Sequence, residues 1–289
     1  MMIHEFITLH PIFTYLFLGL FSLAIGSLLN VIIYRLPLML QAEWTSECRI
    51  LLHQEEVKTE KINLFLPRSF CPNCKTLIPF WHNIPIVSYC LLRGHCRKCH
   101  QHIPLSYLMV EIFCPLLSLF SAYFFGFHLS LLFVLLFIWI NICLFFIDLK
   151  EKILPDGLTL SLLWIGLLAN TEHIFTTLPD AVFSTVIAYL FLWVFIQLFY
   201  LATGKIGMGH GDFKLFAAFG AWFGWTFLPL ILLISSITGA IVGLMYLRVQ
   251  KKTRETPIPY GPFLCLAGLI SLFYGHAIIE WYLGFYMSR

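Results

Sequence analysis

The sequence predicts an all-α, polytopic membrane protein with about eight transmembrane helices. Hydrophobic residues fill 60% of its 289 positions and charged residues only 11%, whereas about a quarter of the residues in soluble domains are charged. Its mean hydropathy is +0.86. Several apolar runs also reach the roughly 20 residues that a helix needs to cross a bilayer. We therefore expect the lipid bilayer to surround most of the chain.

The apolar runs give the expected helices in order. The first covers residues 11–34, and because it lacks a preceding basic segment and a small-residue cleavage site, we expect a retained helix rather than a signal peptide. Five further clear runs cover residues 105–128, 129–147, 180–202, 227–247 and 261–284. Two weaker runs cover residues 158–175 and 213–226. We expect a first transmembrane helix within 1–34, a loop at 35–104 and a helical membrane domain at 105–289.

Lysines and arginines gather on one side of this topology. Eight crossings put residues 35–104, 148–157, 203–212 and 248–260 on the same side, and these segments carry sixteen of the 18 basic residues. Short cytoplasmic loops show such an excess, so we expect this side to face the cytoplasm and both termini to lie on the other side. The topology explains the net charge of +3 without a nucleic-acid partner.

Two Cys-x-x-Cys pairs mark the 35–104 loop. Cys71 and Cys74 are separated by 21 residues from Cys96 and Cys99, a spacing typical of four thiolates around one tetrahedral zinc ion. Two disulfides are the alternative, but a reducing cytoplasm argues against them. We expect a zinc-ribbon-like site. Three histidines near the second pair could act as ligands instead, though we expect them to be solvated: His95, His100 and His102.

Carboxylates at the membrane edge are the next signal, because burying a charge there is costly and usually marks a function. Asp148 follows the run at 129–147, and Asp212 precedes the run at 213–226. The chain crosses out and back between them, so both lie at the same membrane face and can meet. Neighbouring carboxylates share one proton, so one can activate water while the other protonates a leaving group.

Two other carboxylates have different interpretations. Asp156 follows a proline and precedes a glycine, which favours a turn and helix-capping role over catalysis. Glu111 lies about two turns into its expected helix, which favours pairing inside the protein over exposure to lipid.

Several sequence blocks together resemble one family. They are GHGD at 209–212, the segment from Asp148 to LPD at 154–156, GSLLNVIIYRLP at 26–37, PRSFCPNC at 67–74, NIPIVSYCLLRGHCRKC at 83–99 and IPLSYLMVE at 103–111. In this order, they resemble the type IV prepilin peptidase family of bifunctional aspartic proteases and N-methyltransferases. The resemblance runs from the first helix through at least residue 224.

The resemblance implies a reaction and a location. Proteins of this family cut the basic leader from type IV prepilins and type II secretion pseudopilins, after a glycine, and then methylate the new N-terminal residue with S-adenosylmethionine. It implies that Asp148 and Asp212 are catalytic and that the region of Gly94 serves methylation. The expected location is the bacterial inner membrane, with both termini periplasmic and the catalytic face cytoplasmic. No strand–glycine–helix unit indicates where S-adenosylmethionine binds.

The glycines of GMGHGDFK, residues 207–214, fit this interpretation. Glycine adopts backbone conformations that other residues resist, and it lets another chain approach closely. We therefore expect Gly207, Gly209 and Gly211 to supply unusual φ values and to let the backbone approach an extended substrate.

Two other classes of protein remain as alternatives. Paired membrane carboxylates also build proton relays in coupled transporters, but here the pair is expected at one face, and no inverted repeat is visible in the hydropathy. A presenilin-like intramembrane protease with other substrates would share the G-x-G-D motif, but it would lack the cysteine-containing loop between the first two helices.

Overall fold

The computed structural model describes residues 9–54, 63–71, 73–79, 85–205, 207–250 and 258–287. Within these ranges the chain is helical apart from its loops and two isolated β-bridges. Six of the described helices are long and apolar enough to cross a membrane, and two shorter helices occupy the weaker apolar runs. This confirms the predicted all-α, polytopic fold. The chain forms two compact units, Met1–Leu131 and Leu132–Arg289.

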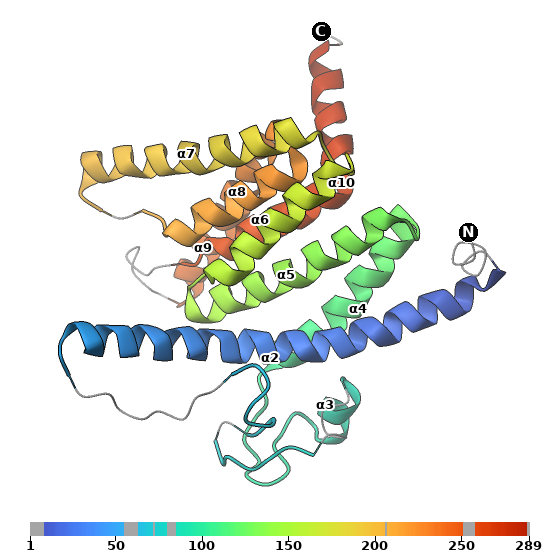
Figure 1. The fold of residues 1–289 in the computed structure, drawn as a ribbon, viewed down its shortest axis with the longest axis vertical. Coiled ribbons are helices and arrows are strands. Elements are labelled where there is room, and N and C mark those ends of the chain that lie inside the picture. Colours follow the sequence, from blue (N-terminus) through green and yellow to red (C-terminus); the bar gives the residue numbers. More distant parts are fainter. Residues whose placement is uncertain are drawn as a thin grey trace. The chain divides into compact units, whose positions relative to one another are not determined.

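The first unit is built on two long helices, α2 (Pro11–Leu51) and α4 (Leu105–Phe125), with the short helix α3 (Val87–Leu91) in the loop between them (Figure 1). The two long helices approach closely at Gly26, where a Cβ would lie 3.3 Å from both the Cβ of Cys114 and the Cα of Glu111. The Cys114 thiol also donates to the carbonyl of Ser22, at 3.2 Å. Small residues at this contact permit the close packing of membrane helices.

Helix α2 is longer than predicted. It continues through Pro37 to Leu51 instead of ending at residue 34. The predicted end follows the apolar run, which stops before Arg35. Pro37 would also favour an end, because a proline inside a helix removes one hydrogen bond and disfavours the helical conformation of the residue before it. The residues after Pro37 include good helix formers such as Leu, Met, Gln, Ala and Glu, and these continue the helix.

The second unit contains most of α5 (Leu129–Glu151) and the five helices that follow. These are α6 (Asp156–Thr171), α7 (Leu178–Thr203), α8 (His210–Phe223), α9 (Leu228–Gln250) and α10 (Gly261–Met287), with a 3-10 turn η2 (Trp225–Phe227) before α9. Local signals mark their starts: Pro155 precedes α6, and the Thr177 hydroxyl accepts the amide of Asp180 at the start of α7, at 3.4 Å. Gly204 ends α7 in the left-handed conformation that glycine favours.

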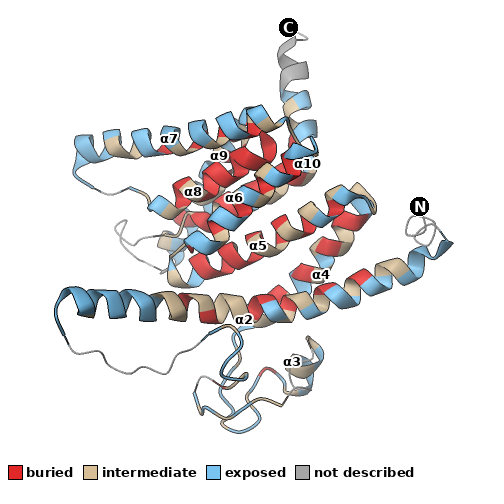
Figure 2. Ribbon diagram, in the orientation of Figure 1, coloured by how far each residue is buried: buried red, intermediate tan, exposed pale blue. Residues whose placement is uncertain are grey.

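Helix α8 forms the core of this unit. Every residue from Asp212 to Phe223 except Lys214 is buried (Figure 2). A Cβ on Gly166 of α6 would overlap the indole of Trp222, and a Cβ on Gly220 would lie 2.7 Å from the carbonyl oxygen of Ser184 in α7. The Trp222 indole also donates to the carbonyl of Leu162, at 2.8 Å. Helices α6 and α7 therefore pack directly against α8.

Helices α6 and α8 run in the same direction. Asp156 at the start of α6 contacts Lys214 near the start of α8, and Asn170 near the end of α6 donates to the carbonyl of Ala221 near the end of α8, at 2.7 Å. One helix, α7, lies between them in the chain and returns it to the side where α6 begins. The ends of α5, α8 and α10 that carry Asp148, Asp212 and Gly261 consequently gather at one end of the unit.

Candidate active site and metal centre

Two buried aspartates meet at this end of the second unit. Asp148 lies in the last turn of α5 and Asp212 in the first turn of α8, and their exposed fractions are 5% and 8%. The two carboxylates are close enough to interact electrostatically, and the buried Cys265 of α10 lies within the range of their charges. Oδ2 of Asp148 has no hydrogen-bond partner among the described residues. Two neighbouring carboxylates without a cation are the arrangement that shares a proton.

Glycines let three segments close around this pair. A Cβ on Gly261, the first residue of α10, would lie 2.6 Å from Oδ2 of Asp148 and 3.2 Å from Leu154. A Cβ on Gly211 would lie 2.8 Å from the Cβ of the same leucine. Leu154 belongs to the short connection between α5 and α6, so this connection packs against the first turns of α8 and α10.

The predicted role of the motif glycines is corrected in part. Gly207, Gly209 and Gly211 are not among the residues with positive φ, and Gly209 has φ −78° and ψ 152°, a conformation open to any residue. The expectation of unusual φ values is therefore wrong. A glycine is required at position 211 because a side chain there would collide with Leu154. Gly209 has only Oδ2 of Asp212 within 4 Å of its Cβ position, at 3.7 Å.

Asp156 does not cap its helix. It is the first residue of α6, after Pro155 as N-cap, and no side-chain capping bond forms there. Both of its carboxylate oxygens instead accept from the Lys214 ammonium, at 2.6 and 2.7 Å. This exposed ion pair joins the start of α6 to the first turn of α8, next to the aspartate pair.

The four predicted cysteine ligands form one cluster in the first unit. Their Sγ atoms all lie within 4.8 Å of one another, and those of Cys71 and Cys99 are 3.7 Å apart. Four thiolates at about 2.3 Å from a zinc ion would be separated by about 3.8 Å, so the cluster fits tetrahedral zinc. The Cys74 and Cys96 thiols are partly exposed and Cys71 is buried.

The two cysteine knuckles have the same backbone geometry. In the first knuckle the amide of Cys71 donates to the carbonyl of Thr76, and the carbonyl of Cys71 accepts from the amide of Lys75. In the second knuckle the amide of Cys96 donates to the carbonyl of Gln101, and the carbonyl of Cys96 accepts from the amide of His100. Lys75 and His100, which each follow the second cysteine of a pair, both have positive φ, at 55° and 54°. An isolated β-bridge closes each knuckle, at Phe70–Leu77 and at His95–His102.

Hydrogen bonds prepare two of these thiols for a metal. The hydroxyl and then the amide of Thr76 lower the pKa of Cys74 to about 6, and the amides of Cys99 and Lys98 lower the pKa of Cys96. Burial raises the pKa of Cys71 to about 11, but a bound zinc ion deprotonates a coordinating thiol. The thiolate is the form that binds metal.

The neighbouring histidines and Gly94 have structural partners. The rings of His95 and His102 contact each other edge to face, with centroids 5.3 Å apart, across their β-bridge. No histidine joins the four-cysteine cluster within the part of the chain described. Gly94 has φ +71°. Its amide donates to the backbone carbonyl of Tyr89, and its carbonyl accepts from the backbone amide of Ile103. It therefore forms the turn after α3, just before the second knuckle.

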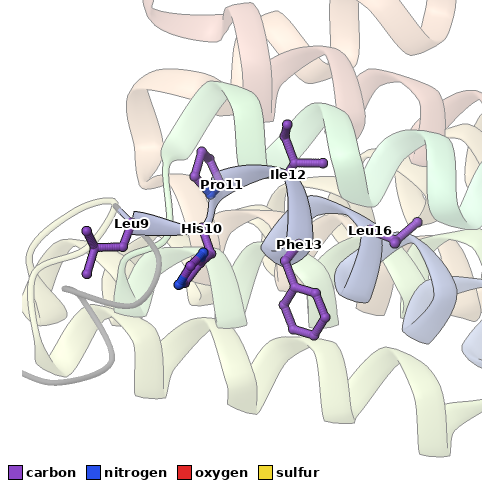
Figure 3. A pocket seen from close by; sticks show the side chains of 6 residues that line it. All are labelled: Leu9, His10, Pro11, Ile12, Phe13 and Leu16. Carbon is purple, nitrogen blue, oxygen red and sulfur yellow. The ribbon is translucent and has the colours of Figure 1, made fainter.

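Neither Asp148 nor Asp212 lines either of two hollows at the surface of the described residues. One, of about 370 Å³, lies at the start of α2 and none of the predicted site residues lines it (Figure 3). The other, of about 310 Å³, lies between α9 and the start of α10. One of its lining residues, Tyr260, directly precedes Gly261, which contacts Asp148. Its lining includes Ser236, Gly239, Ala240, Tyr260 and Phe263.

Comparison with known proteins identifies the family. Residues 20–125 match the bacterial peptidase A24 N-terminal domain, and residues 135–244 match the type IV leader peptidase family. A prepilin leader peptidase/N-methyltransferase of Legionella pneumophila is 58% identical over 287 residues, which cover 99% of this chain and 100% of that protein. The chain belongs to the type IV leader peptidase family. The predicted family resemblance is thereby confirmed.

Other members of the type IV leader peptidase family match over nearly the same length. A prepilin leader peptidase/N-methyltransferase of Pseudomonas aeruginosa is 45% identical over 282 residues, covering 97% of each chain. One of Dichelobacter nodosus is 43% identical over 268 residues, covering 91% of this chain and 92% of that protein. No solved structure matches significantly.

Three residues near the aspartate pair of this leader peptidase are not predictable from the sequence. Gly261 and Cys265 carry no carboxylate, no ligand spacing and no motif that separates them from ordinary packing residues, and Leu154, although it belongs to the LPD block, carries no signal that it contacts Gly211 and Gly261. Gly261 opens an apolar run after a Pro-Tyr pair, and that signal indicates only a helix start. Their importance follows from contacts between segments far apart in the sequence.

Proposed function

We propose that this chain is a membrane-embedded aspartic endopeptidase that removes the leader of type IV prepilins and type II secretion pseudopilins. After cleavage it methylates the new N-terminal residue with S-adenosylmethionine. The observation that carries the proposal is the pair of buried carboxylates at Asp148 and Asp212, in a chain of the type IV leader peptidase family.

The geometry supports a general acid–base mechanism. One aspartate, as the carboxylate, takes a proton from a water molecule whose oxygen attacks the scissile carbonyl carbon. The other, as the acid, gives its proton to the leaving amine when the C–N bond breaks. Because the pair shares one proton, one aspartate is ionised while the other is protonated, as the two roles require. Either aspartate can begin as the acid, because the proton belongs to the pair.

The loop of the first unit supports methylation in this proposal. Cys71, Cys74, Cys96 and Cys99 would hold a structural zinc ion, which keeps the two knuckles together. S-adenosylmethionine, when bound, supplies the methyl group. The region of Gly94, between α3 and the second knuckle, is the proposed place for methylation because its turn is fixed by backbone bonds on both sides.

The distribution of basic residues supports the orientation. The helix ends that carry Asp148, Asp212 and Gly261 adjoin segments that contain basic residues: two in 148–157, one in 203–212 and four in 248–260. Basic loops remain on the cytoplasmic side. We infer that the aspartate pair faces the cytoplasm in the bacterial inner membrane and that both termini are periplasmic, so that a basic leader can reach it without crossing the bilayer. The family matches give no support to a transporter or a presenilin-like protease.

Processing of a prepilin in membranes tests the proposal. Membranes that contain this chain are incubated with a prepilin, with or without S-adenosylmethionine, and the product is analysed by mass spectrometry. We expect loss of the leader in both reactions and the added mass of one methyl group only when S-adenosylmethionine is present. An intact prepilin in both reactions would refute the proposed peptidase activity.

Replacement by alanine is expected to have different effects at Gly209 and at Gly211. In Gly211→Ala the new Cβ would meet the Cβ of Leu154 at 2.8 Å, so the first turn of α8 must move and carry Asp212 with it. Misplacing a catalytic group by 1 Å can reduce the rate by about a hundredfold, and we expect at least a tenfold loss of leader removal. Gly209→Ala, whose Cβ has ordinary contacts, is the matched control and should retain most activity.

Initial rates of leader removal at equal protein levels measure this difference. Equal rates for the two variants would contradict the assignment of Gly211 as the glycine required for space.

A further inference from the structure

Glu111 is a carboxylate within a membrane-spanning helix, and no cation among the described residues forms an ion pair with it. Its Oε2 accepts the backbone amide of Ile86 at 2.8 Å, and its Oε1 lies 3.4 Å from the side-chain amide of Asn30 in α2. Asn30 also donates to the carbonyl of Tyr107, at 3.0 Å. Carboxylates in such positions are costly and usually functional.

The amide held by Glu111 belongs to a strained turn. Ile86 has φ 62° and ψ −50°, and the amide of Val87 donates to the carbonyl of Pro85. This is the γ-turn with a positive central φ, which is rare. A β-branched residue at positive φ is a steric outlier, so isoleucine adopts this conformation only where its surroundings enforce it. The Glu111 carboxylate is the group that binds the central amide.

The turn sets the start of the segment that leads to the second cysteine pair. Ile86 is the N-cap of α3, which is followed by the Gly94 turn and then by Cys96. On the other branch of the loop, Arg35 of α2 is buried and donates to the carbonyls of Asn63, Leu64 and Pro67, shortly before Cys71. A charged side chain from each long helix therefore anchors one branch of the cysteine-containing loop.

We propose that Glu111 is a positioning residue for N-methylation. By holding the amide of Ile86, it keeps the strained turn in place and so sets the position of α3 and the Gly94 turn relative to α2 and α4. The inference rests on the proposed methyltransferase function. Among the described residues, its hydrogen bonds join Asn30 and Ile86 of the unit Met1–Leu131. Both aspartates belong to the unit Leu132–Arg289, so we expect Glu111 to serve methylation and not leader removal.

The test combines removal of the anchor with removal of the strain. Glu111→Ala deletes the acceptor, Glu111→Gln keeps a neutral acceptor, and Ile86→Gly introduces a residue that adopts positive φ freely. We expect Glu111→Ala to lower the rate of methyl transfer to a pre-cleaved pilin about tenfold, the order of a lost charge-assisted hydrogen bond, and Glu111→Gln to lower it less. The double variant Glu111→Ala/Ile86→Gly should recover most of the loss.

Two further measurements separate positioning from general damage. Leader removal should change less than about twofold in every variant, and zinc bound per chain should equal that of the wild type. Glu47→Ala, at an exposed glutamate of α2, is the control for removing a carboxylate from this unit and should methylate normally.

The outcomes are distinct. Unchanged methylation in Glu111→Ala would overturn the inference, as would a double variant no better than Glu111→Ala, because a direct chemical role or a helix-packing role would not be rescued at Ile86. An equal loss of leader removal would overturn it too. A wild-type chain that cleaves but never methylates would refute the methyltransferase part of the proposed function, and the inference with it.

Discussion

Leader removal is expected to be lost when either Asp148 or Asp212 is replaced by asparagine. Asparagine has nearly the same shape, so packing is kept, but its amide can neither take up nor release a proton at this position. Positioned acid–base groups contribute about 10²- to 10⁴-fold to a rate, and we expect a loss within or above this range for each variant. The conversion of a prepilin in membranes, compared at matched expression, measures it.

Glu151→Gln is the matched control for the aspartate variants. Glu151 lies one turn after Asp148 on α5, and it pairs at the surface with Lys150, at 3.4 Å. This change removes a carboxylate from the same helix end without touching the pair, so leader removal should persist. Methylation of a pre-cleaved pilin should also persist in both asparagine variants. Normal cleavage by either of them would exclude the aspartate pair as the catalytic group and would favour the transporter interpretation again.

Loss of the zinc site is expected to reduce methylation before leader removal. Replacing Cys71 and Cys99 with serine removes two of the four ligands, one from each knuckle. Structural zinc contributes about 10–16 kcal/mol to the folding of small zinc domains, so the loop should lose its fixed geometry. We expect at least a tenfold lower rate of methyl transfer and less than one zinc ion per chain, measured by metal analysis of the purified protein.

Cys90→Ser is the control within the same loop. Cys90 is exposed in α3 and lies outside the four-cysteine cluster, so its replacement should alter neither zinc content nor methylation. If the double cysteine variant instead lost both activities equally while its expression stayed normal, the loop would be required for proteolysis as well, and its assignment to methylation alone would be wrong.

The parts of the site that depend on local spacing are predictable from the sequence. Cys71, Cys74, Cys96 and Cys99 form one cluster because each Cys-x-x-Cys pair builds its own turn, and only the distance between two turns is left to the fold. The proximity of Asp148 and Asp212 is also predictable, since an even number of crossings returns the chain to the same face.

The features that depend on long-range packing are not predictable in this way. The contact of Asp156 with Lys214 reflects tertiary surroundings that override the local preference of Asp156 for a helix-capping role. The close approach of Leu154 to Gly211 and of Asp148 to Gly261 involves segments whose order in the chain says nothing of their distance. The strained turn at Ile86 has no sequence signal, because its neighbours carry no residue that favours positive φ.

The shortness of α6 and α8 has a consequence for the bilayer itself. With 16 and 14 residues, they rise about 24 and 21 Å at 1.5 Å per residue, whereas the hydrocarbon core is about 30 Å thick. Lipids adapt to such a mismatch by local thinning. Both helices begin at the end of the unit that holds the aspartates, but α8 is buried in the unit, so the exposed residues of the short α6 are the ones that meet lipid there, and we expect that leaflet to be depressed. A polar peptide segment would then reach the carboxylates through a thinner layer of hydrocarbon.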